Sequence, residues 1–156
     1  ELGHIDQAMR LRQSVYSESL KLLAEEDEAT LRAANNYADS LIDLQRLKEA
    51  KALLRRTIPV ARRVLGKRDD LQLILRNNYA EALYKDDDAT LDDLREALTT
   101  LEDVERTARR VLGGAHPATS NVEQTLREAR EALAAREGDG VSSVCEAVAA
   151  ANLRTA

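Results

Sequence analysis

The sequence has 156 residues, 44% of them hydrophobic and 33% charged, which is typical of a folded domain and excludes a disordered chain. It has no Trp or Phe, so the core must consist of Leu, Ala, Val and Ile, which suit closely packed helices. Only two Pro and six Gly leave little room for the turns of an all-β fold, and an all-α fold is predicted. The formal charge of −5 argues against a general nucleic-acid binder, because such proteins neutralise phosphates with clustered Lys and Arg.

Apolar residues recur at helical spacing and predict six long helices within a domain at 1–136. The predicted ranges are about 4–23, 27–43, 46–65, 70–85, 90–112 and 117–136. The segment EGDG at 137–140 is predicted to be a linker. Residues 141–156 are predicted to form a C-terminal capping helix over the last repeat, the alternative being a tail that is mobile or docks onto a partner.

Two segments of the sequence recur and predict that the helices form a repeat array. The string NNYADSL at 35–41 returns as NNYAEAL at 77–83, a shift of 42 residues. The string ARRVLG at 61–66 returns identically at 108–113, a shift of 47 residues. Both copies end in a glycine, which predicts a helix end there.

The difference between the two shifts predicts an insertion in the loop at 85–90. The register makes Ala8, Ala50 and Ala97 equivalent. Beyond Gly113 we extend the shift of 47. A competing alignment pairs SNVEQTL at 120–126 with NNYAEAL at a shift of 43, but it requires a shorter preceding loop.

The repeated segments resemble the tetratricopeptide repeat of the kinesin light chain type, in which a helix ending in LG is followed by HPDT and an LNNLA-like motif. The corresponding runs are LLAEEDEATLRAANNYA at 22–38, VLGKRDDLQLILRNNYA at 64–80 and VLGGAHPAT at 111–119. The resemblance covers about residues 2–136. It implies a TPR-like right-handed superhelical solenoid of antiparallel helix pairs, and a role as an adaptor or scaffold.

In that family the first helix of each pair lines the concave face, which implies inner helices at 27–43, 70–85 and 117–136. Equivalent polar positions then form two rows along a groove. The first row is Asn35, Asn77 and Gln124, the second is Asp39, Glu81 and Glu128, and Arg32, Asp43, Lys85 and Glu131 lie at the margins.

Amides can bind the backbone of an extended peptide, and carboxylates attract Lys or Arg. The predicted ligand is therefore an extended or helical segment of a partner protein that carries basic residues. The alternative interpretation is that these side chains are solvated helix faces, with the Asn pairs bonding between neighbouring helices as part of the repeat structure.

A second candidate surface is a basic cluster on the outer helices, which could meet an acidic partner or an anionic membrane surface. Its alternative interpretation is a solvated face whose charges complement helix ends. The cluster consists of Lys48, Lys51, Arg55, Arg56, Arg62, Arg63, Lys67 and Arg68.

The sequence carries no pattern that indicates catalysis, a metal or a cofactor. His4 and His116 are far apart and Cys145 is the only cysteine, so neither a zinc site nor an internal disulfide is expected. Phosphate-binding loops and nucleophile elbows are absent. Asp86, Asp87 and Asp88 lack the spacing of a calcium loop.

We therefore expect a non-catalytic protein-interaction scaffold or adaptor. The alternative is a structural subunit embedded in a larger assembly through its outer helices and ends. No apolar run approaches the ~20 residues that cross a bilayer. The chain begins at Glu1 without an initiator Met or a signal-peptide pattern, so we expect a piece of a longer protein, with the cytoplasm as the default localisation.

Overall fold

The computed structural model describes the backbone of residues 2–153 and the side chains of residues 6–138. Its elements are α1 (Leu2–Leu22), α2 (Glu28–Asp43), α3 (Leu47–Val64), α4 (Asp70–Tyr84), α5 (Leu91–Val111) and α6 (Pro117–Leu153). No strand occurs between residues 2 and 153, which confirms the all-α prediction. The bounds of α1 to α5 lie within one or two residues of the predicted ranges.

Short polar side chains fix where three of the helices begin. The carboxylates of Asp27 and Asp69 each accept a hydrogen bond from a backbone N–H two residues further on, at 2.8 and 2.9 Å. Thr90 and Asp93 form a reciprocal capping box at the start of α5. Each cap satisfies backbone donors that have no partner inside the helix.

Glycines make the turns after α3 and α5. Gly66 has φ +85° and Gly113 has φ +91°, a left-handed backbone that glycine adopts without the strain a Cβ would cause. The repeated ARRVLG segments therefore mark helix ends, as predicted. The basic residues at 62, 63, 109 and 110 lie in the last turns, where they complement the helix dipole.

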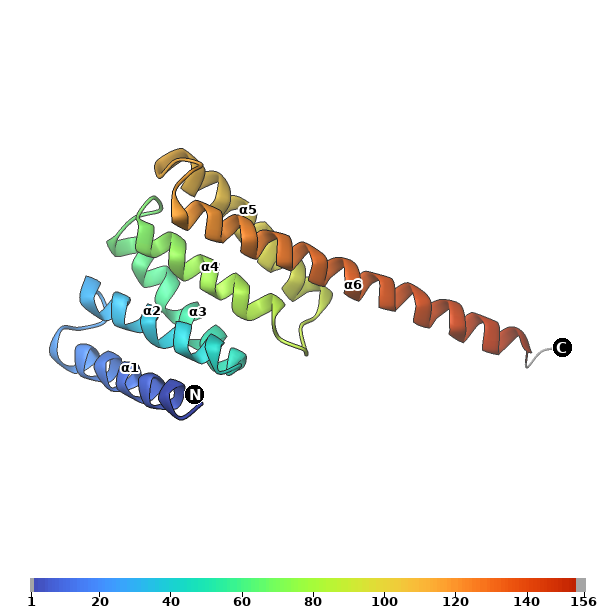
Figure 1. Cartoon of the computed structure of the whole chain (residues 1–156), viewed down its shortest axis with the longest axis horizontal. Coiled ribbons are helices and arrows are strands. Elements are labelled where there is room, and N and C mark those ends of the chain that lie inside the picture. The colour runs from blue at the N-terminus through green and yellow to red at the C-terminus, as the bar shows by residue number, and fades with distance from the viewer. Residues whose placement is uncertain (1, 154–156) are drawn as a thin grey trace.

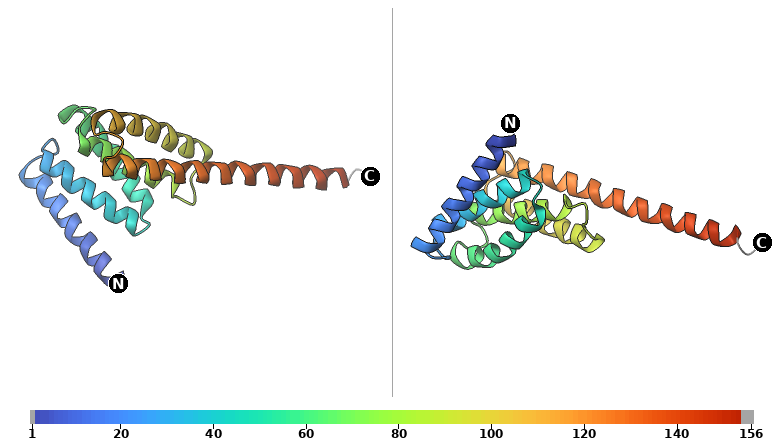
Figure 2. Two further views of the ribbon diagram at one scale, coloured as in Figure 1. Left: turned by 45° about the horizontal axis from the view of Figure 1, so that its top comes forward. Right: turned by 90° about the horizontal axis from the view of Figure 1, so that it is seen from below.

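The helices form two layers of antiparallel neighbours (Figures 1 and 2). In the inner layer α2 packs against α4 and α4 packs against α6. The backbones of α1, α3 and α5 pack against inner helices and not against one another, although Arg56 of α3 reaches the hydroxyl of Tyr16 in α1 at 3.4 Å. The core lies between the layers and consists mainly of Leu and Ala. Ala50 and Ala97 are completely buried, while their equivalent Ala8 is exposed.

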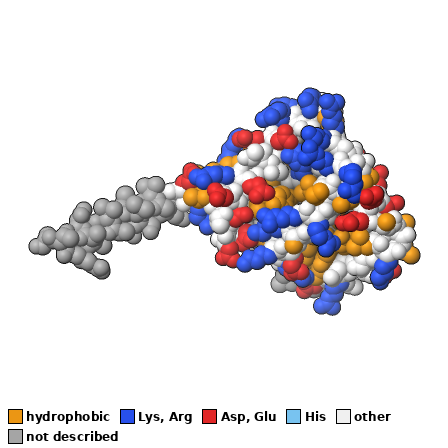
Figure 3. All heavy atoms as spheres, turned by 180° about the vertical axis from the view of Figure 1, so that it is seen from behind, with side chains coloured by type: hydrophobic (Ala, Val, Ile, Leu, Met, Phe, Trp, Pro, Cys, Tyr) orange, Lys and Arg blue, Asp and Glu red, His pale blue; other side chains and the backbone are white. Residues whose placement is uncertain are grey.

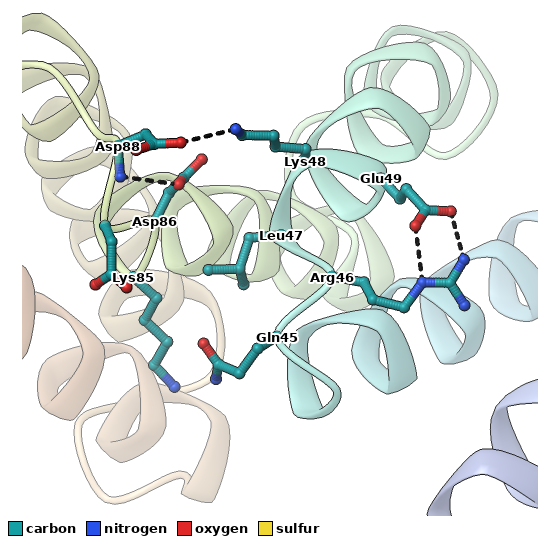
Figure 4. Close-up of a pocket in the computed structure, with 9 residues that line it drawn as sticks. Gln45, Arg46, Leu47, Lys48, Glu49, Lys85, Asp86 and Asp88 are labelled. Atoms are coloured by element: carbon teal, nitrogen blue, oxygen red, sulfur yellow. Dashed lines mark hydrogen bonds and ion pairs between the residues drawn. The ribbon is translucent and has the colours of Figure 1, made fainter.

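The five extra residues of the second repeat lie partly in the predicted loop and partly in a helix. The loop 85–90 replaces the shorter loop 44–46, but α5 also has 21 residues where α3 has 18. The loop is held by two ion pairs to α3, Lys48 with Asp88 and the mostly buried Lys51 with Asp86 (Figure 4 shows the first). The prediction of a purely loop insertion was therefore incomplete.

The predicted linker at 137–140 and the separate helix at 141–156 were wrong. Helix α6 continues without a break from Pro117 to Leu153, and its C-terminal half projects away from the other helices in every view (Figures 1 and 2). Gly in a helix interior costs only about 1 kcal/mol relative to Ala, so two glycines among good helix formers do not end a helix. No described contact shows this segment capping the repeats, and residues 154–156 lie outside the described chain.

Candidate partner-binding groove

A groove of about 520 Å³ lies between the inner helices, and residues at the end of α5 also line it. Each inner helix contributes one face to it, because residues three or four apart lie on the same side of a helix. The lining residues are Asn35, Asp39, Asp70, Leu73, Ile74, Asn77, Asn78, Glu81, Ala108, Leu112, Pro117, Ala118, Asn121 and Val122.

The groove combines an apolar floor with negative charge. Leu73, Leu112 and Val122 supply apolar surface, and Ile74 remains 37% exposed although it is a large aliphatic side chain. The charged residues of the lining are Asp39, Asp70 and Glu81. Neither Lys nor Arg is among the described lining residues, so the charged side chains of the lining itself are all acidic.

Four asparagines link the inner helices across the groove. Asn78 donates to Asn35 at 3.2 Å, joining α4 to α2, and Asn77 donates to Asn121 at 3.3 Å, joining α4 to α6. Asn77 is only 4% exposed, and its Oδ1 accepts no hydrogen bond within the described residues. The asparagines thus hold the repeats together and leave one buried acceptor at the groove wall.

Four of the six predicted row residues line the groove, namely Asn35, Asp39, Asn77 and Glu81. The two row residues from α6 do not. Gln124 is exposed and donates to Glu128 at 2.7 Å, while Glu128 also accepts from the hydroxyl of Tyr84 at 2.6 Å. The third member of both predicted rows is therefore misplaced.

The cause is a displacement of α6 along α4. Helix α6 begins at the position predicted by the shift of 47, yet its contacts with α4 join residues 44 apart, as in Asn77 with Asn121. Between α2 and α4 the bonded residues are 43 apart, one more than the repeat shift of 42. Between α4 and α6 they are 44 apart, three fewer than the repeat shift of 47. The two pairs of helices therefore differ in alignment by about one helical turn, roughly 6 Å along the axis, and the three extra residues of α5 supply about 4.5 Å of this difference.

Asn121 is the groove residue that the preferred alignment missed. The competing alignment at a shift of 43 places Asn121 opposite Asn78 and so contained the signal. Asp70, Leu73, Ile74 and Val122 were also missed, because a search for polar rows does not find the apolar floor. The sequence of one helix does not show whether an apolar side chain on its packed face lies in the core or lines a groove, because this depends on where the neighbouring helices lie.

The predicted margin residues do not line the groove in the structure. Arg32 is paired with Glu28 on its own helix, and Lys85 is paired with Glu81 at one end of the groove. Asp43 and Glu131 are exposed outside it. Of the row residues, Asp39 is itself paired at 3.1 Å, with Arg12 of α1. These ion pairs are at least partly solvated, so a partner cation can replace the present one at small cost.

The contact between α4 and α6 shifts the ionisation of two groups. Burial, and then the hydrogen bond donated to Glu128, raise the pKa of the Tyr84 hydroxyl. The bonds from Tyr84 and Gln124 lower the pKa of the Glu128 carboxyl. Glu128 is therefore a carboxylate committed to a structural contact, which agrees with its position outside the groove.

A second hollow of about 430 Å³ lies between the loops that follow α2 and α4 (Figure 4). Most of its charged side chains are paired with other residues of the fold. Arg46 pairs with Glu49, Lys48 pairs with Asp88, and Lys85 pairs with Glu81. This hollow is therefore a polar junction between repeats, and its residues hold the 85–90 loop against α3.

The side chains of residues 6–138 contain no group of three His, Cys, Asp or Glu residues that could hold a metal ion, and His4 and Cys145 lie outside them. Within the described helices none has the length and apolar character to span a bilayer.

Two comparisons with known proteins found similar proteins. The sequence model of the tetratricopeptide repeat matches residues 30–70, which span the α2–α3 pair and the start of α4. A solved structure from Podosopora anserina, assigned to kinesin light chains with nearly identical TPR-like repeats, has 18% sequence identity and a TM-score of 0.48. The match covers 97% of this chain and 90% of that one. No curated protein sequence matches the chain. Residues 30–70 thus match one tetratricopeptide repeat, and the helices on either side of this segment pack with it in an all-α array.

Proposed function

We propose that this chain is a non-catalytic adaptor that binds a protein segment in the groove between α2, α4 and α6. The observation that carries the proposal is the lining itself, where an apolar floor meets three carboxylates and no Lys or Arg. Tetratricopeptide repeats generally mediate protein–protein interaction, and the charge of this groove selects the kind of segment that fits.

The segment should carry at least one basic and one aliphatic side chain. Asp39 and Glu81 lie on neighbouring inner helices, so a Lys or Arg placed between them can interact with both carboxylates. Ile74 lies on the groove floor, and a ligand that covers its apolar surface gains about 25 cal/mol of binding free energy for each Å² removed from water. The unsatisfied Oδ1 of Asn77 can accept a backbone N–H from an extended ligand after a small rotation.

Selection of random peptides against the protein, followed by fluorescence anisotropy, tests the proposal. We expect the selected peptides to pair Lys or Arg with aliphatic residues. The double variant Asp39→Asn/Glu81→Gln keeps the shape of the groove and removes two charges, so it should bind these peptides at least about tenfold more weakly.

The matched control is Asp43→Asn/Glu131→Gln, which makes the same change in net charge at exposed positions outside the groove. It should retain the affinity within about twofold. Selected peptides that are acidic, or that bind both double variants as tightly as the unaltered protein, contradict groove binding.

One observation favours the second candidate, a structural subunit of a larger assembly. Helix α1 exposes Leu11, Val15 and Leu22, with Leu22 at 78% and Leu11 at 66%. Residues at the positions equivalent to the first two in α3, Leu53 and Thr57, are buried. If this face is an assembly contact, Leu11→Gln should reduce the size of the native complex in gel filtration, while the groove variant should leave it unchanged.

A further inference from the structure

A basic pocket lies on the opposite side of α4 from the groove. It has a volume of about 390 Å³ and is lined by residues of α3, α4, α5 and the turn between α3 and α4. Its cationic residues are Arg62, Lys67, Arg68, Arg76 and Arg110. Lys and Arg side chains also gather at this end of the molecule in the reverse view, over the α3–α4 and α5–α6 turns (Figure 3).

The fold separates this pocket from the rest of the basic cluster predicted from the sequence. Arg55 and Arg56 bond to tyrosine hydroxyl oxygens. Three further members of the cluster are paired with carboxylates. They are Lys48 with Asp88, Lys51 with Asp86 and Arg63 with Glu26. Only Arg62, Lys67 and Arg68 of the predicted cluster reach the pocket, where α4 and α5 add Arg76 and Arg110.

Most of the positive charge in the pocket has no partner. Arg76 pairs with Asp103 at 2.8 Å, and Asp103 is the one carboxylate among the lining residues. Arg62, Lys67, Arg68 and Arg110 make no ion pair with any described residue, although the chain has 28 acidic residues against 23 basic ones. Cations from separate elements repel one another, so the arrangement has an unfavourable electrostatic energy that an anion would relieve.

A buried amide at the pocket is also incompletely bonded. Gln72 lines the pocket, its side chain is 2% exposed, and its Oε1 has no hydrogen-bond partner among residues 6–138. Buried amides nearly always have partners, because an unpaired one costs about 1–3 kcal/mol. The NH2 group of the same amide is a hydrogen-bond donor, and an anionic oxygen in the pocket would accept from it.

We infer that this pocket binds a phosphate group carried by a partner protein, such as a phosphoserine or phosphothreonine side chain. Guanidinium groups donate paired hydrogen bonds to phosphate oxygens, and three of the four unpaired cations are arginines. A phosphate also concentrates more negative charge than one carboxylate. The pocket is recessed between helices, so a protruding side chain fits it better than a flat membrane surface does. This site is independent of the acidic groove.

NMR titration of the isotope-labelled full chain tests the inference, because it detects weak binding and locates it. The probe is a blocked pentapeptide with a central phosphoserine and neutral flanks, beside the same peptide with Ser or Glu at the centre. We expect the phosphopeptide to shift the side-chain N–H signals of Gln72, Arg62 and Arg110. The Ser peptide should not, and the Glu peptide should bind at least about tenfold more weakly than the phosphopeptide.

A matched pair of charge variants separates a built site from general attraction. Arg62→Gln/Arg110→Gln removes two unpaired, exposed pocket cations and should weaken phosphopeptide binding at least about tenfold. Arg10→Gln/Arg95→Gln makes the same charge change at exposed positions elsewhere and should change the affinity by less than about twofold. Circular dichroism checks that both variants remain helical.

Three results would overturn the inference. One is the absence of shifts in the side-chain N–H signals up to ~10 mM phosphopeptide, a concentration well above the dissociation constant expected for a charged pocket. Another is an equal loss of affinity in the two double variants. The third is binding to vesicles of anionic phospholipid that the pocket variant abolishes while the phosphopeptide does not bind, which would assign the pocket to a membrane.

Discussion

Three alanines at equivalent repeat positions should respond differently to the same substitution. Ala50 and Ala97 are completely buried where α3 and α5 pack on inner helices, whereas Ala8 is exposed on α1. Replacement by Leu adds three carbon atoms at each position. The buried sites have no room for them without movement of a helix, because protein interiors are close-packed.

From this packing we expect Ala50→Leu to lower the free energy of unfolding by about 2–3 kcal/mol, within the range for overpacked cores. At this chain length that corresponds to a fall in Tm of about 4–12 °C. Ala8→Leu should change the free energy by less than about 0.5 kcal/mol, because its side chain extends into solvent and Leu is nearly as good a helix former as Ala.

Urea denaturation followed by circular dichroism at 222 nm measures the three variants under one set of conditions. A loss at Ala8 as large as that at Ala50 would refute the reasoning, because it would mean that the repeat position and not the burial decides the outcome. An unchanged midpoint for both Ala50→Leu and Ala97→Leu would show that the interface between the layers is loosely packed.

Other substitutions test single contacts. Gln72→Met removes an unsatisfied buried acceptor at similar volume and should leave stability unchanged or raise it by about 1 kcal/mol in urea denaturation. Thr90→Ala removes the cap of α5 and should cost about 1 kcal/mol, and a loss near zero would contradict the capping box. The hydrogen bond from Lys51 holds the pKa of the Asp86 carboxyl below its usual value. The ionised Asp86 therefore stabilises the fold above about pH 4, and this contribution disappears as the pH falls through the lowered pKa. The stability difference between the unaltered protein and Asp86→Asn should therefore shrink between about pH 5 and pH 3. Gly138→Ala should stabilise the helix by about 0.5–1 kcal/mol and raise the helical signal in circular dichroism, because Gly138 is exposed within a continuous helix and an added Cβ would meet no other atom. No change there would favour the break that the sequence predicted.

The helix bounds could be predicted because local signals determine them. Asp27, Asp69 and Thr90 cap helices through hydrogen bonds that span two or three residues, and Gly66 and Gly113 end helices by their own backbone conformation. The same locality explains the error at 137–140. Glycine there permits a turn but does not impose one, and no tertiary contact is needed for the helix to continue.

The candidate groove was predictable only where two repeats have the same length. Asn35 and Asn77 fall in one row because α2 and α4 are joined by a unit of regular size. Gln124 fails because the extra turn of α5 moves α6 along its neighbour, and the sequence does not say how an insertion divides between a loop and a helix. Asn121 took the place of Gln124 through a displacement of roughly one turn, about 6 Å.

Helix α4 connects the two candidate sites and explains why their charges can differ. Its groove face carries Asp70, Asn77 and Glu81, and its other face carries Gln72 and Arg76 toward the basic pocket. Both sites are open to solvent on opposite faces of one helix, where mobile ions screen charges over about 8 Å at physiological salt, so the two sites interact only weakly. A single partner could therefore engage a basic segment in the groove and an acidic group in the pocket. Loss of either site would then weaken binding by a factor that depends on the linker between the two segments, while the other contact remained intact.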